Sequence, residues 1–190
     1  MTDQQEMDEK EFVLLAKQGD HNAFESLVYL NANYVFNLAF RLTNNHQEAE
    51  DLSQEAFIRM WKALPNFRAD SRFRTWLYRI VTNLCYDRLP KLRQELASIE
   101  FDDVIDLHIP TEGHPEKSLL SQEIQTELHK VIDHLPQSYR LLITLRHLQA
   151  LSYNEISEVT GQPLGTVKAG ISRARKLLRE RMTQYESQSG

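Results

Sequence analysis

Disulfide bonds and cysteine-based metal sites within one chain are excluded by composition, because the 190-residue sequence contains a single cysteine, Cys85. Six glycines and six prolines are few for an all-β protein, which needs many turns. No run of about 18 apolar residues occurs, so no direct membrane insertion is expected. The acidic, polar N-terminus does not resemble a secretory signal. These absences favour a globular, helical protein of the cytoplasm.

An excess of positive charge is also missing, since the formal net charge is −5. Taken alone, this total argues against a nucleic-acid-binding protein, because such proteins are usually basic. The charge is unevenly distributed, however: residues 68–93 carry +5 and residues 166–190 carry +4, whereas residues 1–67, 94–117 and 118–165 carry −6, −6 and −2. Salt screens a field beyond about 8–10 Å, so local patches matter more than the total. The two basic blocks are therefore candidate nucleic-acid-binding segments, and the alternative is that both are solvated helix faces.

Apolar residues at helical spacing predict a first bundle of about four helices in residues 1–93. Asp20 and Asn45 stand where helix N-caps are expected, and Asn45 is followed three residues later by Glu48. Pro65 ends the third helix. A loop follows, and Ser71 is the expected cap of a helix that runs to about residue 90. The only cysteine lies in this last helix and is interpreted as a small core residue.

Residues 94–117 interrupt the helical pattern, with seven acidic side chains, two prolines and one glycine. We interpret them as an acidic linker. A second bundle is predicted in residues 118–190, starting near Ser118 with a helix that stops at Pro136. The fold class predicted from these patterns is all-α, with two small helical bundles joined by the linker.

The end of the second bundle has the pattern of a helix-turn-helix unit. Ser152 and Glu155 form a capping box for a short helix, residues 161–165 form a turn, and Thr166 is the expected N-cap of a long basic helix. Apolar residues occupy one face of this last helix. Its other faces carry Lys168, Ala169, Ser172 and Arg173 for base edges, and Arg175, Lys176, Arg179 and Arg181 for phosphates. Gly170 is unusual in the middle of a helix, where it costs about 1 kcal/mol relative to alanine.

Aromatic and arginine side chains alternate in residues 67–79, which is the composition of a surface that stacks unpaired bases. Trp76 also fits a stripe of core-facing residues in the same helix. Its spacing therefore leaves open whether the indole packs in the core or stacks on a base.

The two halves together resemble an extracytoplasmic-function (ECF) sigma factor of bacterial RNA polymerase, of the sigma-70 family, over nearly the whole chain. In the first half the resemblance depends on Glu48-Ala-Glu-Asp51-Leu-Ser-Gln54-Glu-Ala-Phe57-Ile and Phe73-Arg-Thr-Trp76-Leu-Tyr-Arg-Ile80. In the second half it depends on Leu151-Ser-Tyr-Asn-Glu155-Ile and Gly165-Thr-Val-Lys168, with Arg173-Ala-Arg175 after it. Two motif sets in this order, joined by an acidic linker, are more specific than one helix-turn-helix pattern.

The resemblance implies three binding surfaces. It implies that residues 1–93 bind core polymerase and the minus-ten element, and that residues 118–190 read the minus-thirty-five element. The implied contacts to the clamp helices of the largest polymerase subunit are Glu50, Asp51, Gln54, Glu55, Phe57, Ile58 and Trp61. Those to the minus-ten element, as single-stranded DNA, are Asn66, Phe67, Arg68, Asp70, Ser71, Arg72, Arg74, Arg79 and Asn83. Those to the duplex minus-thirty-five element are Thr166, Lys168, Ala169, Ser172, Arg173, Arg175 and Lys176.

Further expectations follow from the same resemblance. An anti-sigma factor is an implied partner, and the linker is implied to thread through the polymerase. Many relatives carry a Ser-Arg pair where this chain has Ala169-Gly170, which removes two polar candidates for base contact. No catalytic, metal or cofactor motif is present, so neither an enzyme nor a cofactor is expected. Two alternatives use the same residues: a conventional helix-turn-helix repressor or activator, and an all-α module that binds acidic partners.

Overall fold

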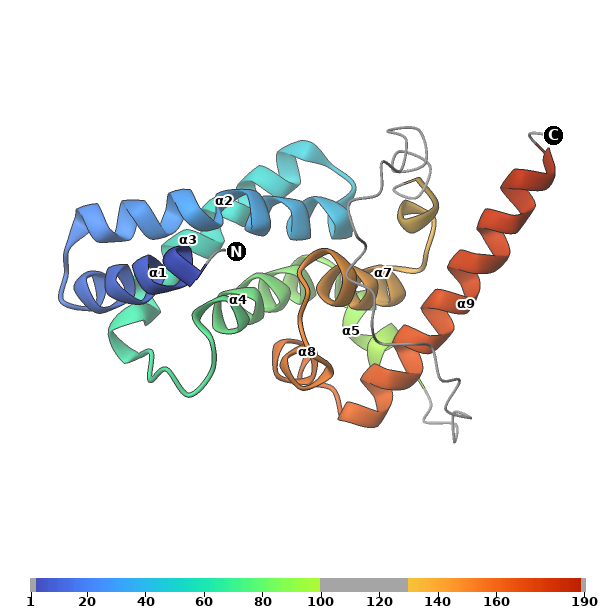
Figure 1. The fold of residues 1–190 in the computed structure, drawn as a ribbon. Coiled ribbons are helices and arrows are strands. Elements are labelled where there is room, and N and C mark those ends of the chain that lie inside the picture. The colour runs from blue at the N-terminus through green and yellow to red at the C-terminus, as the bar shows by residue number, and fades with distance from the viewer. Residues whose placement is uncertain (1–2, 100–129, 189–190) are drawn as a thin grey trace.

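All regular elements in the described part of the chain, residues 3–99 and 130–188 of a computed structural model, are helical (Figure 1). The first half contains α1 (Asp3–Lys17), α2 (His21–Thr43), α3 (His46–Ala63), a 3₁₀ turn η1 (Leu64–Asn66), α4 (Phe73–Arg88) and α5 (Pro90–Ala97). The second half contains α7 (Gln137–Ile143), a π-helical turn η2 (Thr144–Leu148), α8 (Tyr153–Thr160) and α9 (Leu164–Gln188). The predicted all-α class is confirmed.

Three of these helices have a side-chain N-cap at the residue that the sequence predicts. Asp20 Oδ1 accepts a hydrogen bond from Ala23 N–H at 3.0 Å and caps α2. Asn45 Oδ1 accepts from Glu48 N–H at 3.1 Å and caps α3. In the capping box of α8, the Ser152 hydroxyl accepts from the N–H of Glu155, while the Glu155 carboxylate accepts from the N–H of Ser152. Each cap satisfies amide groups that have no partner within the helix.

Other predicted boundaries are wrong by a few residues. Ser71 does not cap α4, because that helix begins at Phe73 with Arg72 at its N-cap and no side-chain cap. Thr166 does not cap α9, which begins at Leu164. The first half was predicted to end at residue 93, but α5 continues to Ala97. Leu92 and Leu96 are fully buried and hold α5 against the rest of the fold. Most of the predicted linker lies outside the described residues, and so does the helix predicted from Ser118 apart from its last turn, residues 130–133.

The first half is built on α1–α4, whose apolar faces meet in a core of large aliphatic side chains. Leu27, Leu52, Met60 and Leu77 are fully buried in it. Cys85 is also fully buried, which confirms its interpretation as a core residue, and burial raises the pKa of its thiol to about 12. The thiol therefore stays neutral at physiological pH.

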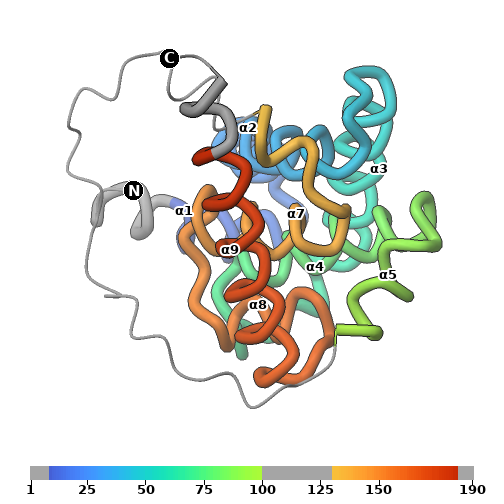
Figure 2. The backbone as a smooth tube through the Cα atoms, turned by 90° about the vertical axis from the view of Figure 1, so that its right-hand side faces the viewer, coloured from blue at the N-terminus to red at the C-terminus, as the bar shows by residue number. Residues whose placement is uncertain are grey.

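The two halves share one continuous apolar core, in which α4 packs against α8, and α7 packs against α2 and α5 (Figures 1 and 2). Arg140 of α7 lies in this contact with 9% of its surface exposed. Its guanidinium donates hydrogen bonds to the backbone carbonyls of Arg41 (3.1 Å), Leu135 (3.0 Å) and Asp133. The side chains of Arg41 and Asp133 form an ion pair at 2.8 Å. A buried guanidinium thus joins the C-terminal end of α2 to the start of the second half.

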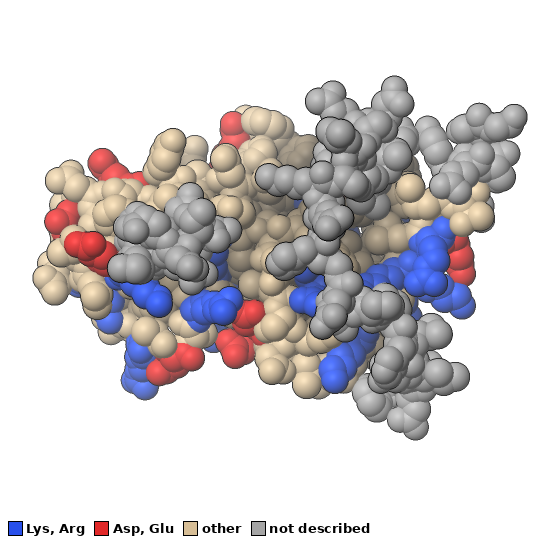
Figure 3. All heavy atoms as spheres, in the orientation of Figure 1, with Lys and Arg blue, Asp and Glu red and all other residues tan. Residues whose placement is uncertain are grey.

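Charged side chains are distributed over the surface in groups, as the sequence predicts. Figure 3 shows acidic side chains gathered toward the α1–α3 end and basic side chains continuing across the same face to α9. Within residues 3–99 and 130–188, none of the helices combines the length and the apolar character that crossing a membrane requires.

Candidate nucleic-acid interface

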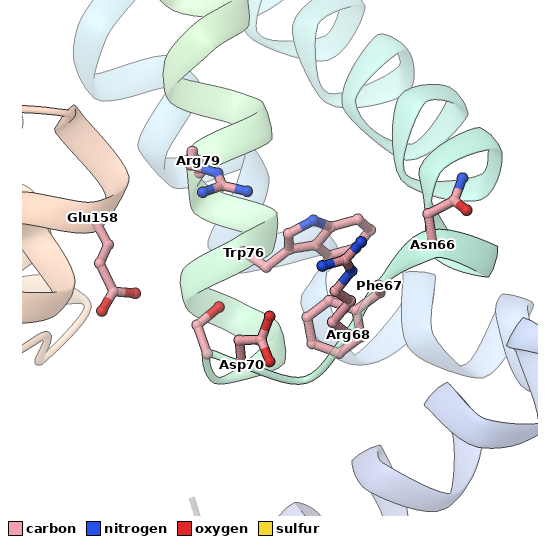
Figure 4. Close-up of a pocket in the computed structure, with 8 residues that line it drawn as sticks. Asn66, Phe67, Arg68, Asp70, Trp76, Arg79 and Glu158 are labelled. Atoms are coloured by element: carbon pink, nitrogen blue, oxygen red, sulfur yellow. The ribbon is translucent and has the colours of Figure 1, made fainter.

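The loop after η1 and the first two turns of α4 enclose a cleft of about 370 Å³ (Figure 4). It is lined by Asn66, Phe67, Arg68, Asp70, Ser71, Trp76, Arg79 and, from α8, Glu158. Six of these eight residues belong to the set implied to contact the minus-ten element. The structure thus brings together side chains that stack (Trp76), donate (Arg68 and Arg79) and accept hydrogen bonds (Asp70), which is the chemistry that holds an unstacked base.

An aromatic cluster supports the cleft from below. The ring of Phe67 lies 5.9 Å from that of Phe73 and 4.9 Å from that of Trp76, and Phe73 and Trp76 are 5.7 Å apart. Phe67 and Phe73 are buried, whereas Trp76 is half-buried. The indole therefore packs on the cluster and also lines the cleft, so both interpretations of its spacing hold in part.

Two features that fix the loop carry no local sequence signal. Lys17 Nζ, fifty residues earlier, donates a hydrogen bond to the Phe67 carbonyl at 2.5 Å and ties the loop to α1. Ala69 adopts a left-handed backbone with φ of +58°, a conformation that residues other than glycine rarely adopt. Strained backbone of this kind persists where the surrounding structure imposes it, and it is found most often at functional sites.

The remaining residues of the minus-ten set are not all at the cleft. Asn83 is exposed on α4, one turn beyond Arg79. Arg72 is exposed at the N-cap of α4, with its Nη1 3.8 Å from Oε1 of Glu155. Arg74 points away, because its guanidinium lies 4.2 Å above the Tyr34 ring and 3.4 Å from a carboxylate oxygen of Glu9. The structure therefore places Arg74 in a supporting contact between α4 and the first two helices.

The face of α3 implied to bind polymerase is open to solvent. Asp51 and Gln54 are exposed, and Ile58 exposes 49% of its surface, which is unusual for a large apolar side chain. Glu50 and Glu55 are half-buried.

The other two members of this set are partly enclosed by the fold. Phe57 packs on the core, and the Trp61 ring stacks on His21 at 4.9 Å and meets Phe24 edge-on at 4.7 Å. Both side chains are half-buried, so only part of each is available to a binding partner.

Fewer of the predicted DNA-contacting side chains of α9 are exposed to solvent than the sequence suggests. Lys168 and Lys176 are exposed, whereas Thr166, Ser172, Arg173 and Arg175 are half-buried. The prediction that Ala169 lies on an exposed face is wrong, since it is 0% exposed. The reason is tertiary: this half of α9 is covered on more than one side, and Ala169 joins the same apolar core as Ile156 and Val159 of α8.

Packing of η2 against α9 holds one candidate phosphate contact in place. The Nε–H of Arg175 donates to Nε2 of His147 at 3.1 Å. His147 keeps an exposed edge, but desolvation of the rest of its ring lowers its pKa to about 4, and the positive charges of Arg175 and Arg146 act in the same direction. The imidazole is therefore neutral at physiological pH and able to accept this hydrogen bond.

Titratable clusters suited to a metal ion are not found in the described residues, where no three His, Cys, Asp or Glu side chains come together. The chemistry of the site is thus that of charged and aromatic groups on three surfaces: the cleft beside α4, the outer face of α3 and the basic side of α9.

Two family models match the chain over the same segments. Sigma-70 region 2 matches residues 27–95, and Sigma-70 region 4 matches residues 125–178. The first covers α3, the cleft and α4, and the second covers the helix-turn-helix unit.

Curated relatives match almost end to end. The ECF RNA polymerase sigma factor SigW of Bacillus subtilis is 36% identical over 183 residues, covering 93% of this chain and 98% of the relative. The ECF RNA polymerase sigma-E factor of Escherichia coli is 36% identical over 168 residues, covering 85% of this chain and 87% of the relative.

Solved structures of similar fold also cover most of the chain. The sigma factor RpoE of Bartonella quintana, solved in complex with the anti-sigma factor NepR, superimposes with a TM-score of 0.62 at 27% identity, covering 84% of this chain and 96% of that one. CnrH, solved with the cytosolic domain of CnrY, shares the fold with a TM-score of 0.66 at 23% identity over 93% of this chain and 98% of that one. The chain therefore belongs to the sigma-70 family and is an ECF sigma factor, which directs promoter-specific initiation of transcription by RNA polymerase.

Proposed function

We propose that the three surfaces divide the work of initiation among them. The outer face of α3, with Asp51, Gln54 and Ile58 at its centre, binds the clamp helices of core polymerase. The cleft beside α4 captures a base from the unpaired minus-ten element. The basic side of α9, with the exposed Lys168 and Lys176 and the half-buried Arg173, binds the minus-thirty-five duplex.

The observation that carries this proposal is the cleft, in which residues from the loop and from α4 converge around a space of about 370 Å³. Extruding a base costs a few kcal/mol, and stacking on an aromatic side chain returns about 1–3 kcal/mol per base. Binding at the cleft therefore favours the melted promoter over the paired one. The chain contributes binding energy in this scheme and has no catalytic activity of its own, because polymerase performs the chemistry.

The region assignment is part of the proposal. Residues 1–93 form region 2 and residues 118–190 form region 4. The acidic linker occupies residues 94–117, of which the first four complete α5. Polymerase and chromosome share the bacterial cytoplasm, and we place this chain with them. An anti-sigma factor is a further proposed partner, supported by the B. quintana complex with NepR.

Reconstituted transcription tests the proposal. Purified chain, core polymerase and genomic DNA should give transcripts with defined start sites, whose upstream sequences then supply the minus-ten and minus-thirty-five elements. Arg79→Ala should weaken binding of a single-stranded minus-ten oligonucleotide about tenfold or more, since one hydrogen bond from a charged donor contributes about 1.5–3 kcal/mol. Lys91→Ala is the matched control, because this exposed cation lies on α5, outside the residues that line the cleft.

A separate variant tests the contact with the minus-thirty-five duplex. Arg173→Ala should weaken binding to the minus-thirty-five duplex by about 1–3 kcal/mol and leave the oligonucleotide result unchanged. Absence of any transcript, together with tight duplex binding by the isolated chain, would contradict the division of labour and favour a repressor.

A further inference from the structure

Helix α1 precedes the segment that matches the region 2 model, residues 27–95, and none of its described side chains lines the cleft. It nevertheless packs on α2 and contacts η1, immediately before the loop that forms the cleft (Figure 1). Two of its side chains, Glu9 and Lys17, contact the two ends of this loop. They lie eight positions apart, about two helical turns, and so project from the same side of the helix.

The first of these contacts is at the start of the loop. Lys17 Nζ donates a hydrogen bond to the Phe67 carbonyl at 2.5 Å, and the ring of Phe67 is buried, with 6% of the residue exposed. A carbonyl in a loop has no partner from helical hydrogen bonding, so a donor from another helix fixes its direction. Both the backbone and the side chain of Phe67 are therefore held.

The second contact is in the first turn of α4, a helix that begins at Phe73 without a side-chain cap. Arg74 Nε lies 3.4 Å from Oε1 of Glu9, and the guanidinium carbon lies 4.2 Å from the centre of the Tyr34 ring. Glu9 is 8% exposed, and a buried carboxylate is costly unless a cation stays beside it. The pairing with Glu9 thus fixes Arg74, and with it the start of α4, from α1.

Asn31 of α2 holds the Glu9 carboxylate in place. Its Nδ2 donates to Glu9 Oε1 at 3.4 Å and to the Leu27 carbonyl at 2.9 Å, and the residue is 1% exposed. Buried polar groups are stable where they are hydrogen-bonded to one another. Helices α1, α2 and α4 therefore meet in one polar cluster directly behind the loop.

A strained residue lies between the two contacts. Ala69 has a φ of +58° and is exposed, so burial of its methyl group does not offset the strain. A left-handed alanine persists only where the surrounding structure imposes it. Its neighbours Arg68 and Asp70 both line the cleft (Figure 4), so the directions of their side chains depend on this backbone conformation.

We propose that Glu9 and Lys17 are positioning residues for capture of the minus-ten base. From α1 they brace both ends of the loop and so hold Ala69 in the conformation that directs Arg68 and Asp70 into the cleft. Neither side chain needs to touch DNA. Because the loop is formed before DNA arrives, binding does not have to supply the cost of ordering it. The effect on DNA rests on the proposed function of the cleft, whereas the brace itself does not.

Binding of a single-stranded minus-ten oligonucleotide to the full chain, measured by fluorescence anisotropy, tests the role of Lys17. Lys17→Met keeps most of the aliphatic stem and removes the donor, and it should weaken binding about fivefold, since part of the free energy of a charged hydrogen bond is lost from loop positioning. Lys17→Arg should stay within about twofold of the wild type, because a guanidinium can donate to the same carbonyl. Lys10→Met is the matched control, with the same loss of charge at an exposed position of α1, and should bind as the wild type does.

A glycine at position 69 separates positioning from charge. Glycine adopts a positive φ without steric cost, so it needs less support from the brace. In the Lys17→Met background, Ala69→Gly should recover at least half of the lost affinity on a logarithmic scale. Alone it should change the affinity less than about twofold, because relief of strain and added loop entropy act in opposite directions. An electrostatic role of Lys17 predicts no recovery, since glycine does not restore the charge.

Glu9→Gln tests the other end of the loop. It removes the charge that pairs with Arg74 and keeps the shape of the side chain, and it should weaken oligonucleotide binding about threefold or more. Circular dichroism at the assay temperature checks that the variant is folded. Glu11→Gln, at an exposed position of the same helix, is the matched control and should leave binding unchanged.

The outcomes separate the brace from the function of the cleft. Wild-type affinity in both Lys17→Met and Glu9→Gln would overturn the brace if Arg79→Ala still weakens binding. Weaker binding by Lys17→Met without recovery by Ala69→Gly would overturn positioning and leave Lys17 as a contributor to the local electrostatic field. If Arg79→Ala also has no effect, the assignment of the cleft to minus-ten DNA fails, and the role of the brace in base capture fails with it.

Discussion

Replacing Arg140 should destabilise the protein more than almost any other single change to a charged residue. Its guanidinium satisfies three backbone carbonyls, two of them at residues 133 and 135 and the third at Arg41 in the other half. Arg140→Met keeps the apolar stem and removes every donor. The three carbonyls then lose their partners in a buried contact, where each unsatisfied group is costly.

The magnitude follows from the number of bonds. Hydrogen bonds to a charged donor contribute about 1.5–3 kcal/mol each, so three give an upper bound of about 4.5–9 kcal/mol. Desolvation of the guanidinium, which also lowers the pKa of Arg140, reduces this total. We therefore expect Arg140→Met to lower the free energy of unfolding by about 3–5 kcal/mol.

Urea-induced unfolding, followed by tryptophan fluorescence and circular dichroism, measures this change. Arg140→Lys should recover less than half of the loss, because one ammonium group cannot reach three carbonyls in the geometry of a planar guanidinium. Arg93→Met, at an exposed position of α5, is the control and should stay within about 0.5 kcal/mol of the wild type. A loss below about 1 kcal/mol for Arg140→Met, or full recovery by lysine, would refute the reasoning.

Three further changes test other parts of the molecule. Phe73→Ala should lower the free energy of unfolding by about 3–5 kcal/mol, because it leaves a cavity beneath the cleft, and a urea titration showing less than about 1 kcal/mol would contradict the aromatic support. Ile58→Glu should weaken binding to core polymerase about tenfold or more in a fluorescence-anisotropy titration, with unfolding unchanged; equal affinity would exclude this face as the docking surface. His147 has its pKa lowered from 6.5 to about 4, so the folded state favours the neutral imidazole and its contribution to stability is lost as the pH falls through that interval. His147→Gln should flatten the decline in stability between pH 6.5 and 4, and an identical decline in wild type and variant would show that another group is responsible.

Three caps and most of the cleft were predictable from sequence because their signals are local, whereas the similar local signals at Ser71 and Thr166 do not mark caps. Asp20, Asn45 and Ser152 each bond to an amide three residues away, so spacing alone identifies them. The residues of the cleft come mostly from one loop and the helix directly after it, and their order along the chain already places them together.

The errors about burial arise where distant segments meet. Ala169 has the spacing of an exposed residue, and only the packing of the N-terminal half of α9 within the shared core buries it. Contact between the halves depends on residues of α4 and α8 that lie some eighty positions apart, as Thr75 and Glu155 do. Helical periodicity shows which face of a helix is apolar, but not which partner will cover that face.

The buried thiol of Cys85 has a practical consequence for following the motion of this molecule. Because the only cysteine of the chain is fully buried and its pKa is raised to about 12, it reacts poorly with maleimide reagents, which attack the thiolate. Cysteines introduced at exposed positions in the two halves, such as Tyr29 and Glu180, can then carry a fluorescent donor and acceptor on an otherwise unmodified chain. Single-molecule energy transfer between these dyes would report the distance between the two halves of the free factor, and would show whether polymerase or promoter DNA changes that distance.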